Sequence, residues 1–154
     1  MRMRKRTRAR EISLQILYLI DISEDSYQNA WDKFWAVELK ESPELEETEI
    51  KEFCWRLVKG TMEKIKEIDE IISKYTENWR LPRIGTVERN VLRLATYELI
   101  FCPEIPPIVS IDEAVELAKR YSGLEAGKFV NGILDRIRKG ETEGRKKVEG
   151  KNER

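Results

Sequence analysis

Apolar residues recur along this chain at intervals of three and four positions, and hardly anywhere at intervals of two. The first spacing lines one face of an α-helix, whereas the second is typical of a half-buried β-strand. At least five amphipathic segments of helical length follow one another with short breaks. The pattern therefore predicts an all-α fold.

The segment from about residue 8 to residue 22 differs from the other predicted helices, because its apolar side chains lie on more than one face. It contains the longest apolar run of the chain, Ile16–Ile20. That run is far shorter than the roughly 20 residues of a membrane-spanning helix. A helix that is apolar nearly all round is buried on most sides. We therefore expect this first helix to be central, with other helices packing against it from two directions.

Capping residues, prolines and glycines divide the rest of the chain into further helices. The expected segments span about residues 27–39, 43–75, 86–102, 111–121 and 125–139. Ser26 is a suitable N-cap for the first of them. Gly60 should kink or break the second, because glycine costs about 1 kcal/mol relative to alanine inside a helix. Ser110 and Glu113 have the spacing of a capping box, which predicts that the fourth begins there.

The helix expected from Thr86 has one apolar stripe and a polar remainder. The polar residues are Glu88, Arg89, Arg93 and Glu98. We see no internal repeat and expect a single domain over residues 1–139. Residues 140–154 are mostly charged residues and glycine. Such a segment buries too little apolar surface to fold, so we expect a disordered tail.

Histidine is absent, which removes the usual general base near neutral pH and the commonest metal ligand. The two cysteines, Cys54 and Cys102, form no C-x-x-C pair, and a reducing cytoplasm is their expected setting. Asp112, Glu113 and Glu116 form an acidic cluster, but a helix N-terminus already favours acids there. We therefore predict that the chain is not an enzyme and holds no metal.

The segment from Gly123 to Lys128 superficially matches a phosphate-binding loop. Such a loop has four residues between its glycines, a hydroxyl residue after the lysine and a strand before it. Here three residues separate Gly123 from Gly127, Phe129 follows Lys128, and a helix precedes. A turn between helices is the better interpretation. The amides at the start of the following helix, with Lys128 beside them, could still hold a phosphate.

The net charge is zero, with 29 basic and 29 acidic residues, but the charges are unevenly distributed. Six of the first ten residues are basic and none is acidic: Arg2, Arg4, Lys5, Arg6, Arg8 and Arg10. The other 144 residues carry a net charge of −6. Clustered guanidinium groups are typical of phosphate-backbone recognition. A membrane-surface helix would need exposed apolar anchors, which the first helix is expected to bury. The basic arm therefore predicts a nucleic-acid partner and no membrane, with a solubilising terminus as the alternative.

Tryptophan side chains are the other candidates for contacts with bases. Trp31, Trp35 and Trp55 occur at helical spacing among aliphatic residues, which favours a place in the core. Trp79 stands in the turn expected around Pro82, and it is the least clear of the four.

Five segments, taken in order, are similar to one known family. They are Arg8–Tyr18, Glu88–Leu99, Ile105–Pro106, Ile111–Lys119 and Lys128–Asp135. Together they resemble the NusB family of bacterial transcription antitermination factors over residues 8–135. Residues 24–75 match in helical character more than in residue identity. The resemblance implies an all-α fold of about seven helices, in two three-helix bundles that share or flank the first helix.

The same resemblance implies an RNA-binding adaptor without a cofactor. Proteins of this family pair with NusE, a small-subunit ribosomal protein. The pair binds the single-stranded boxA element of ribosomal RNA transcripts, so that an RNA polymerase antitermination complex reads through terminators. This role implies a cytoplasmic protein. A homodimer that hides the NusE-facing surface is an open alternative for the free protein.

The resemblance also implies roles for individual residues. Lys5, Arg6, Arg8 and Arg10 correspond to the RNA-contacting region, and Lys128 joins them through the helix-end argument above. Tyr18, Glu88 and Phe129 correspond to the NusE-facing surface, and Glu125 to a position linked to antitermination efficiency. Ordinary packing would equally explain Tyr18 and Phe129, and helix capping would explain Glu88.

Two other functions stay open. Ribosomal RNA cytosine methyltransferases carry a NusB-like segment ahead of a catalytic domain, but the printed sequence ends at Arg154 without the start of such a domain. One alternative is therefore a stand-alone RNA-binding domain related to that of these enzymes. A helical oligomerisation module without RNA would require the basic arm to be inert.

Overall fold

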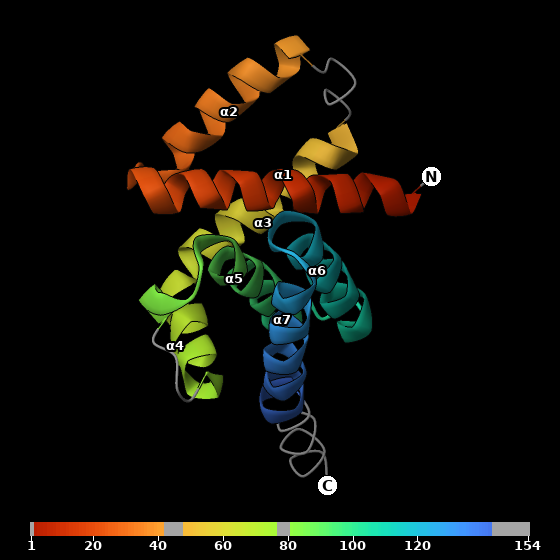
Figure 1. Ribbon diagram of the computed structural model, residues 1–154. Helices are drawn as coiled ribbons and strands as arrows, with labels where there is room; N and C mark the ends of the chain where they lie inside the picture. The colour runs from red at the N-terminus through yellow and green to blue at the C-terminus, as the bar shows by residue number, and fades with distance from the viewer. Residues whose placement is uncertain (1, 42–47, 77–80, 143–154) are drawn as a thin grey trace, which may run out of the picture. The chain divides into compact units, whose positions relative to one another are not determined.

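The computed structural model describes residues 2–41, 48–76 and 81–142, and all regular structure in these ranges is helical (Figure 1). The elements are α1 (Arg2–Ser23), α2 (Tyr27–Glu41), α3 (Thr48–Glu63), α4 (Ile65–Tyr75), the 3-10 turn η2 (Leu81–Arg83), α5 (Thr86–Phe101), α6 (Pro107–Ser122), α7 (Leu124–Ile137) and the π-helical segment η3 (Arg138–Thr142). The all-α prediction is confirmed. No helix in the described ranges is long and apolar enough to cross a membrane.

The chain divides into two compact units, residues 1–64 and residues 65–154. The first unit contains α1, α2 and α3, and the second contains α4 to α7 with η2 and η3. In the first unit α1 packs along α3, and α2 contacts both. In the second unit α5 contacts α4, α6 and α7. The expected arrangement of two three-helix bundles around the first helix stays a prediction.

The core of the first unit joins α1 to α3 through apolar side chains and one buried polar contact. Ile12, Ile16 and Leu17 of α1 are buried, as is Cys54 of α3. The Ser13 hydroxyl lies 2.8 Å from the Ala9 carbonyl oxygen and 3.2 Å from Sγ of Cys54. Burial raises the pKa of the Cys54 thiol to about 12, although the Ser13 contact opposes the shift. This thiol is therefore uncharged at neutral pH.

Aromatic side chains fill the contact between α2 and α3. The Trp31 ring centroid lies 5.3 Å from that of Trp35 and 4.8 Å from that of Trp55. Trp35 is buried, whereas Trp31 and Trp55 are half-buried. The predicted core position is confirmed for Trp35, while Trp79 lies outside the described residues.

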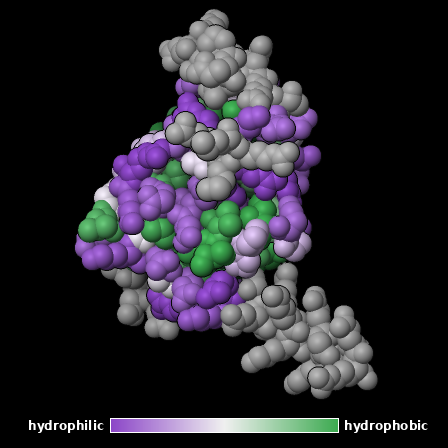
Figure 2. All heavy atoms as spheres, turned by 90° about the vertical axis from the view of Figure 1, so that its right-hand side faces the viewer, coloured by the Kyte–Doolittle hydropathy of each residue, from purple (hydrophilic) through white to green (hydrophobic). Residues whose placement is uncertain are grey.

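In the second unit α5 is the most deeply buried helix. Its side chains from Leu94 to Ile100 are all buried, including that of Glu98. The Glu98 carboxylate accepts a hydrogen bond of 3.0 Å from the Ser110 hydroxyl on α6. Glu98 is a polar residue in the interior, and apolar residues also occur at the surface. Figure 2 shows apolar side chains gathered among hydrophilic ones on one face.

Several helix boundaries agree with the prediction. The Ser26 hydroxyl accepts a hydrogen bond of 3.2 Å from the Asn29 amide, as expected of an N-cap. Helix α5 ends before Pro103, and Gly123 ends α6 with a φ of 95°. That value lies in the left-handed region that favours glycine.

Two boundaries need comment. The break between α3 and α4 lies at Lys64 rather than at Gly60, whose carbonyl accepts a helical hydrogen bond from the Lys64 amide, so the prediction at Gly60 is wrong. A glycine penalty of about 1 kcal/mol is smaller than the packing gained by continuing the helix there. The expected helix start at Ser42–Pro43 lies outside the described residues.

The prediction of a capping box at Ser110 and Glu113 is also wrong. Helix α6 begins earlier, with Pro106 as N-cap and Pro107 in the first turn. Proline suits this position because its missing N–H would have no helical partner there. Ser110 is therefore inside the helix, where its hydroxyl donates to Glu98.

The last helix continues past the expected end near Gly140 as the π-helical segment η3. The Tyr75 hydroxyl donates a hydrogen bond of 3.1 Å to Glu141, and the ring of Tyr75 packs directly on Gly140. A Cβ atom at position 140 would lie too close to the end of that ring, so a larger residue there would require Tyr75 to move. Residues 143–154 of the expected tail lie outside the described ranges.

Candidate nucleic-acid interface

The basic residues near the N-terminus belong to α1, which begins at Arg2, earlier than the sequence indicated. Lys5 is half-buried, and its Nζ lies 3.4 Å from a carboxylate oxygen of Glu49 on α3. Arg8 pairs with Glu11 one turn along the same helix, at 3.0 Å. The helix thus holds the basic side chains at fixed intervals, and acidic neighbours partly neutralise two of them.

Arg6 and Arg10 share a different kind of partner, the aromatic ring of Phe53 on α3. The guanidinium carbon of Arg6 lies 4.4 Å from the ring centroid, and that of Arg10 lies 5.3 Å from it. Both distances fall within the range of cation–π attraction. Arg6 is exposed to solvent, whereas Arg10 is only 2% exposed.

This difference changes the interpretation of Arg10. The family resemblance implied that Lys5, Arg6, Arg8 and Arg10 all belong to the RNA-contacting region. Arg10 is too deeply buried to present its guanidinium to a ligand, because it packs into the core beside Phe53. Arg6 has no hydrogen bond or ion pair within the described ranges, so its N–H donors face solvent. A direct contact of Arg10 with RNA is therefore disfavoured.

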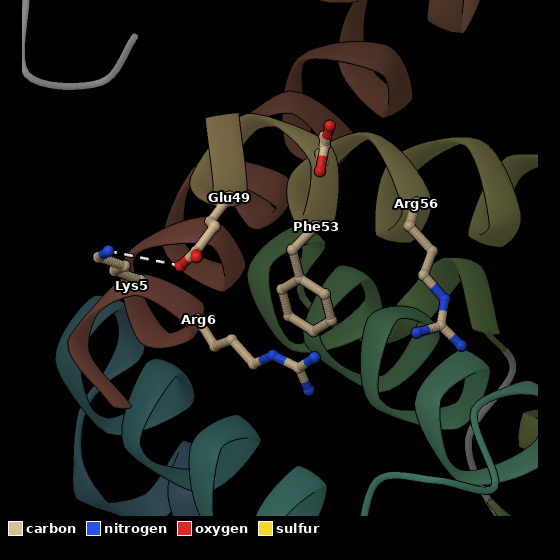
Figure 3. Close-up of a pocket in the computed structure, with 6 residues that line it drawn as sticks. Lys5, Arg6, Glu49, Phe53 and Arg56 are labelled. Atoms are coloured by element: carbon tan, nitrogen blue, oxygen red, sulfur yellow. Dashed lines mark hydrogen bonds and ion pairs between the residues drawn. The ribbon is translucent and has the colours of Figure 1, made fainter. Parts of the chain in front are cut away.

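A pocket of about 440 Å³ opens beside these residues (Figure 3). It is lined by Lys5, Arg6, Glu49, Glu52, Phe53 and Arg56. In Figure 3 the Arg6 guanidinium lies just below the Phe53 ring, and the Arg56 guanidinium lies to the right of it. The pocket thus combines a planar cation on an aromatic ring with donors and acceptors of hydrogen bonds.

The remaining candidates belong mainly to the second unit. On α7, Lys128 is exposed and pairs with Glu125 at 3.5 Å, and half-buried Phe129 follows. Gly127 is buried against the aliphatic part of Lys119, so this glycine serves packing rather than a phosphate loop. The structure thus places three of the predicted site residues, Glu125, Lys128 and Phe129, within the first two turns of one helix.

Glu88 and Tyr18 occupy separate positions. Glu88 lies in the first turn of α5, and its carboxylate folds back over Gly85, the N-cap residue. A carboxylate at this position interacts favourably with the helix dipole, which agrees with the capping explanation. Tyr18 lies on α1 in the first unit and is 37% exposed. Its ring is therefore accessible to a partner.

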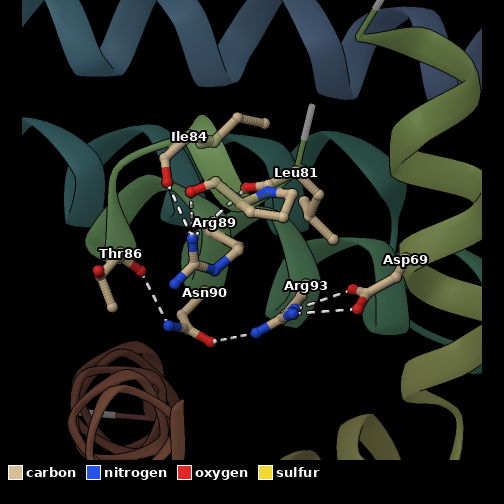
Figure 4. A network of polar contacts seen from close by, with 8 residues as sticks. Asp69, Leu81, Ile84, Thr86, Arg89, Asn90 and Arg93 are labelled. Atoms are coloured by element: carbon tan, nitrogen blue, oxygen red, sulfur yellow. Dashed lines mark hydrogen bonds and ion pairs between the residues drawn. The ribbon is translucent and has the colours of Figure 1, made fainter. Parts of the chain in front are cut away.

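A second arginine cluster, which the sequence analysis did not identify, lies in the second unit (Figure 4). Arg93 donates to both carboxylate oxygens of Asp69 at 2.8 and 3.0 Å, and to Asn90 at 3.3 Å. Arg89 donates to the carbonyl of Ile84 at 3.0 Å and lies 3.4 Å from that of Leu81. This network links α5 to α4 and to the turn around η2. The sequence offered no signal for it, because its members resemble an ordinary polar helix face.

The comparisons with known proteins agree with the fold. The family model described as NusB family matches residues 7–139. A transcription antitermination protein NusB from Thermodesulfovibrio yellowstonii is 41% identical over 145 residues, covering 89% of this chain and 93% of that protein. The protein of that name from Thermotoga maritima is 57% identical over 89 residues, covering 58% of this chain and 63% of that protein.

Solved structures give the same result. The T. maritima NusB structure matches with a TM-score of 0.78 and 41% identity, covering 88% of this chain and 91% of that one. A crystal structure of antitermination factors NusB and NusE in complex with double-stranded RNA matches with a TM-score of 0.79 and 34% identity. That match covers 89% of this chain and 98% of the other.

Proposed function

This chain belongs to the NusB family, and from that premise we propose that it is an RNA-binding antitermination adaptor. In this role it pairs with NusE and binds single-stranded boxA-type RNA in ribosomal RNA transcripts. The observation that carries the proposal is the similarity of this chain, over 89% of its length, to a NusB solved with NusE and double-stranded RNA, which supports NusE and RNA as partners in general. Members of the family are not enzymes, so binding is the whole of the activity.

RNA binding is assigned to the basic side chains of Lys5, Arg6 and Arg8 at the start of α1. Arg6 is exposed and makes no hydrogen bond or ion pair within the described ranges, while Lys5 and Arg8 can exchange their carboxylate partners for phosphates. Arg10 supports Phe53 from within the core. Because the rest of the chain is net negative, this basic end attracts a polyanion from a distance. Lys128 is a second, weaker candidate on α7.

The NusE-facing surface is assigned to Tyr18, Glu88, Glu125 and Phe129. An exposed tyrosine and a half-buried phenylalanine offer apolar area for a protein to cover, and the carboxylates offer fixed charge. A second copy of the chain could cover the same aromatic side chains, so a homodimer would compete with NusE. Recruitment of RNA polymerase would follow from assembly on the nascent transcript, which occurs in the cytoplasm.

Binding of labelled RNA tests the proposal. Fluorescence anisotropy would compare boxA-like and scrambled single-stranded RNA, with the protein alone and mixed with NusE. We expect salt-sensitive binding of both RNAs by the protein alone, and a preference for boxA once NusE is present, because phosphate contacts do not read sequence. Lys66→Ala, which removes an exposed cation from α4, serves as the charge control.

Two results would contradict the proposal. If neither RNA binds with or without NusE, the RNA-binding role is wrong, and the oligomerisation module becomes the better explanation. If RNA binds but NusE changes neither affinity nor preference, the adaptor role is wrong.

A further inference from the structure

The pocket beside Phe53 contains more acidic groups than binding of phosphate requires. Glu49 is neutralised by Lys5 at 3.4 Å. Glu52 is exposed and has no hydrogen bond or ion pair within the described ranges. An unpaired carboxylate beside two arginines repels a phosphate and weakens a site built only for the RNA backbone. Its presence indicates a ligand group that donates hydrogen bonds.

Nucleobases differ in the donors and acceptors on their edges. A carboxylate accepts up to two parallel hydrogen bonds and donates none. Guanine presents two neighbouring donors, N1–H and the N2 amino group, on its Watson–Crick edge. It also presents the acceptors O6 and N7, which arginine commonly binds. Adenine and cytosine place an acceptor nitrogen beside their amino group, and uracil has a single N–H. Guanine therefore matches a pocket with both a free carboxylate and an arginine.

Stacking supplies the remaining element of a base site. Unstacked bases in single-stranded RNA are commonly held against aromatic rings or arginine planes. The Phe53 ring is only 8% exposed, but Arg6 lies over it at 4.4 Å. The outer face of the Arg6 guanidinium is thus a planar platform that the ring holds in place. A pocket of about 440 Å³ is large enough for one nucleoside.

We propose that this pocket binds one unstacked guanine of a single-stranded RNA. The base stacks on Arg6, its N1–H and N2 amino groups donate to Glu52, and Arg56 donates to O6 and N7. The inference rests on the proposed RNA-binding function and adds base selectivity within the first unit. Such a contact would supply sequence information that the phosphate contacts of α1 lack.

Short RNA probes test the pocket directly with the full chain. The probes are hexauridylate, the same hexamer with one guanosine at its third position, and versions with inosine or adenosine there. Inosine lacks only the N2 amino group. We expect the guanosine probe to bind about tenfold more tightly than hexauridylate, as for other bidentate base contacts. The inosine probe should fall between them, and the adenosine probe should resemble hexauridylate.

Variants of three residues that line the pocket test the assignment of selectivity to Glu52. Glu52→Gln should abolish the preference for guanosine while leaving or raising the affinity for hexauridylate, because a negative charge is removed. Glu49→Gln removes a carboxylate from the same helix and pocket, and it should keep the preference. Arg6→Lys preserves charge but not planarity, so it should reduce the preference with little change in salt dependence.

The outcomes separate this inference from the function on which it rests. Equal binding of the four probes, or an unchanged preference in Glu52→Gln, would overturn the guanine site while leaving RNA binding intact. Absence of binding by any probe, together with no binding of the longer boxA-like RNA, would overturn both.

Discussion

Arginine side chains are held in opposite ways in the two units of this molecule. In the first unit Arg6 and Arg10 lie with their guanidinium groups over the Phe53 ring, and Figure 3 shows this for Arg6. In the second unit Arg89 and Arg93 direct their N–H groups at backbone carbonyls and a carboxylate (Figure 4). An exposed arginine held by its flat face, such as Arg6, keeps donors for a ligand, whereas one held by its donors has fewer to offer. The group that an arginine contacts therefore decides whether it can bind a ligand or stabilises the fold.

The environment strengthens this contrast. The Arg93 side chain is 14% exposed and that of Asp69 is 28% exposed, so their bidentate pair is largely removed from water. Arg6 is exposed, and attraction between a cation and a ring there contributes only about 0.5 to 1 kcal/mol. We therefore expect the second-unit arginines to govern stability and Arg6 to govern RNA affinity.

The largest effect is expected for Asp69→Ala. Removing the carboxylate leaves the half-buried Arg93 without its main partner, so the free energy of unfolding should fall by about 2 to 3 kcal/mol. Urea unfolding followed by far-UV circular dichroism measures this, and RNA affinity should not change. In a double-mutant cycle with Arg93→Ala, the double variant should lose less than the sum of the single losses. Additive losses would mean that the pair is not coupled.

Arg89→Ala should have the next largest effect. It removes the donor that ties the Ile84 and Leu81 carbonyls to α5, and we expect a loss of about 1.5 to 2 kcal/mol in unfolding free energy. Arg83→Ala, an exposed residue of the same turn, is the matched control and should change stability by less than about 0.5 kcal/mol. Equal losses in the two variants would remove the distinction that we draw.

Arg10→Ala tests the buried member of the ring pair. Loss of its packing against Phe53 should reduce the free energy of unfolding by about 1 kcal/mol, while the dependence of RNA affinity on salt should stay the same. Thermal unfolding and salt titrations of anisotropy measure the two quantities. A flatter salt dependence would instead assign Arg10 to the RNA-contacting set.

Arg6→Ala should show the reverse behaviour. Stability should change by less than about 1 kcal/mol, whereas the slope of log affinity against log salt should shrink by roughly 0.7 for one lost phosphate contact on a single strand. Lys66→Ala, measured in parallel, should leave the slope unchanged. If Arg6→Ala lowers stability as much as Arg89→Ala does, the proposed division between supporting and binding arginines is wrong.

The smallest effect at neutral pH is expected from ionisation of the thiol of Cys54, the residue after Phe53 on α3. Its pKa is about 12 in the folded protein because of burial, against 9.0 when unperturbed. The buried, protonated thiol therefore contributes fully to stability below pH 9. Its contribution declines as the pH rises toward 12, since the thiol of the unfolded chain loses its proton first. Above pH 9 the free energy of unfolding should decline more steeply for the native protein than for Cys54→Ala. Parallel curves would indicate that the thiol is accessible to water.

Much of the fold was predictable from local features of the sequence. The spacing of apolar residues indicated helices throughout, and the boundaries expected at Ser26, near residue 102 and at the Gly123 turn were correct. Each of these signals acts within one helical turn, through a backbone angle or a nearby amide, so neighbours in sequence are enough to decide it. Composition alone also excluded histidine-dependent catalysis and histidine-bound metals, because the chain contains no histidine.

The roles of the polar residues depended on the tertiary structure. Ser110 resembled a helix cap in the sequence. Its hydroxyl instead donates a hydrogen bond to Glu98, 12 positions away, because both side chains are buried where α5 packs against α6. Arg93 finds Asp69 24 positions away on α4. Arg6 and Arg10 carry the same charge four positions apart, yet packing of α1 against α3 buries one and exposes the other. The sequence alone therefore specified where cations occur, whereas burial, which depends on contacts between distant segments, determined which of them keep their donors for RNA.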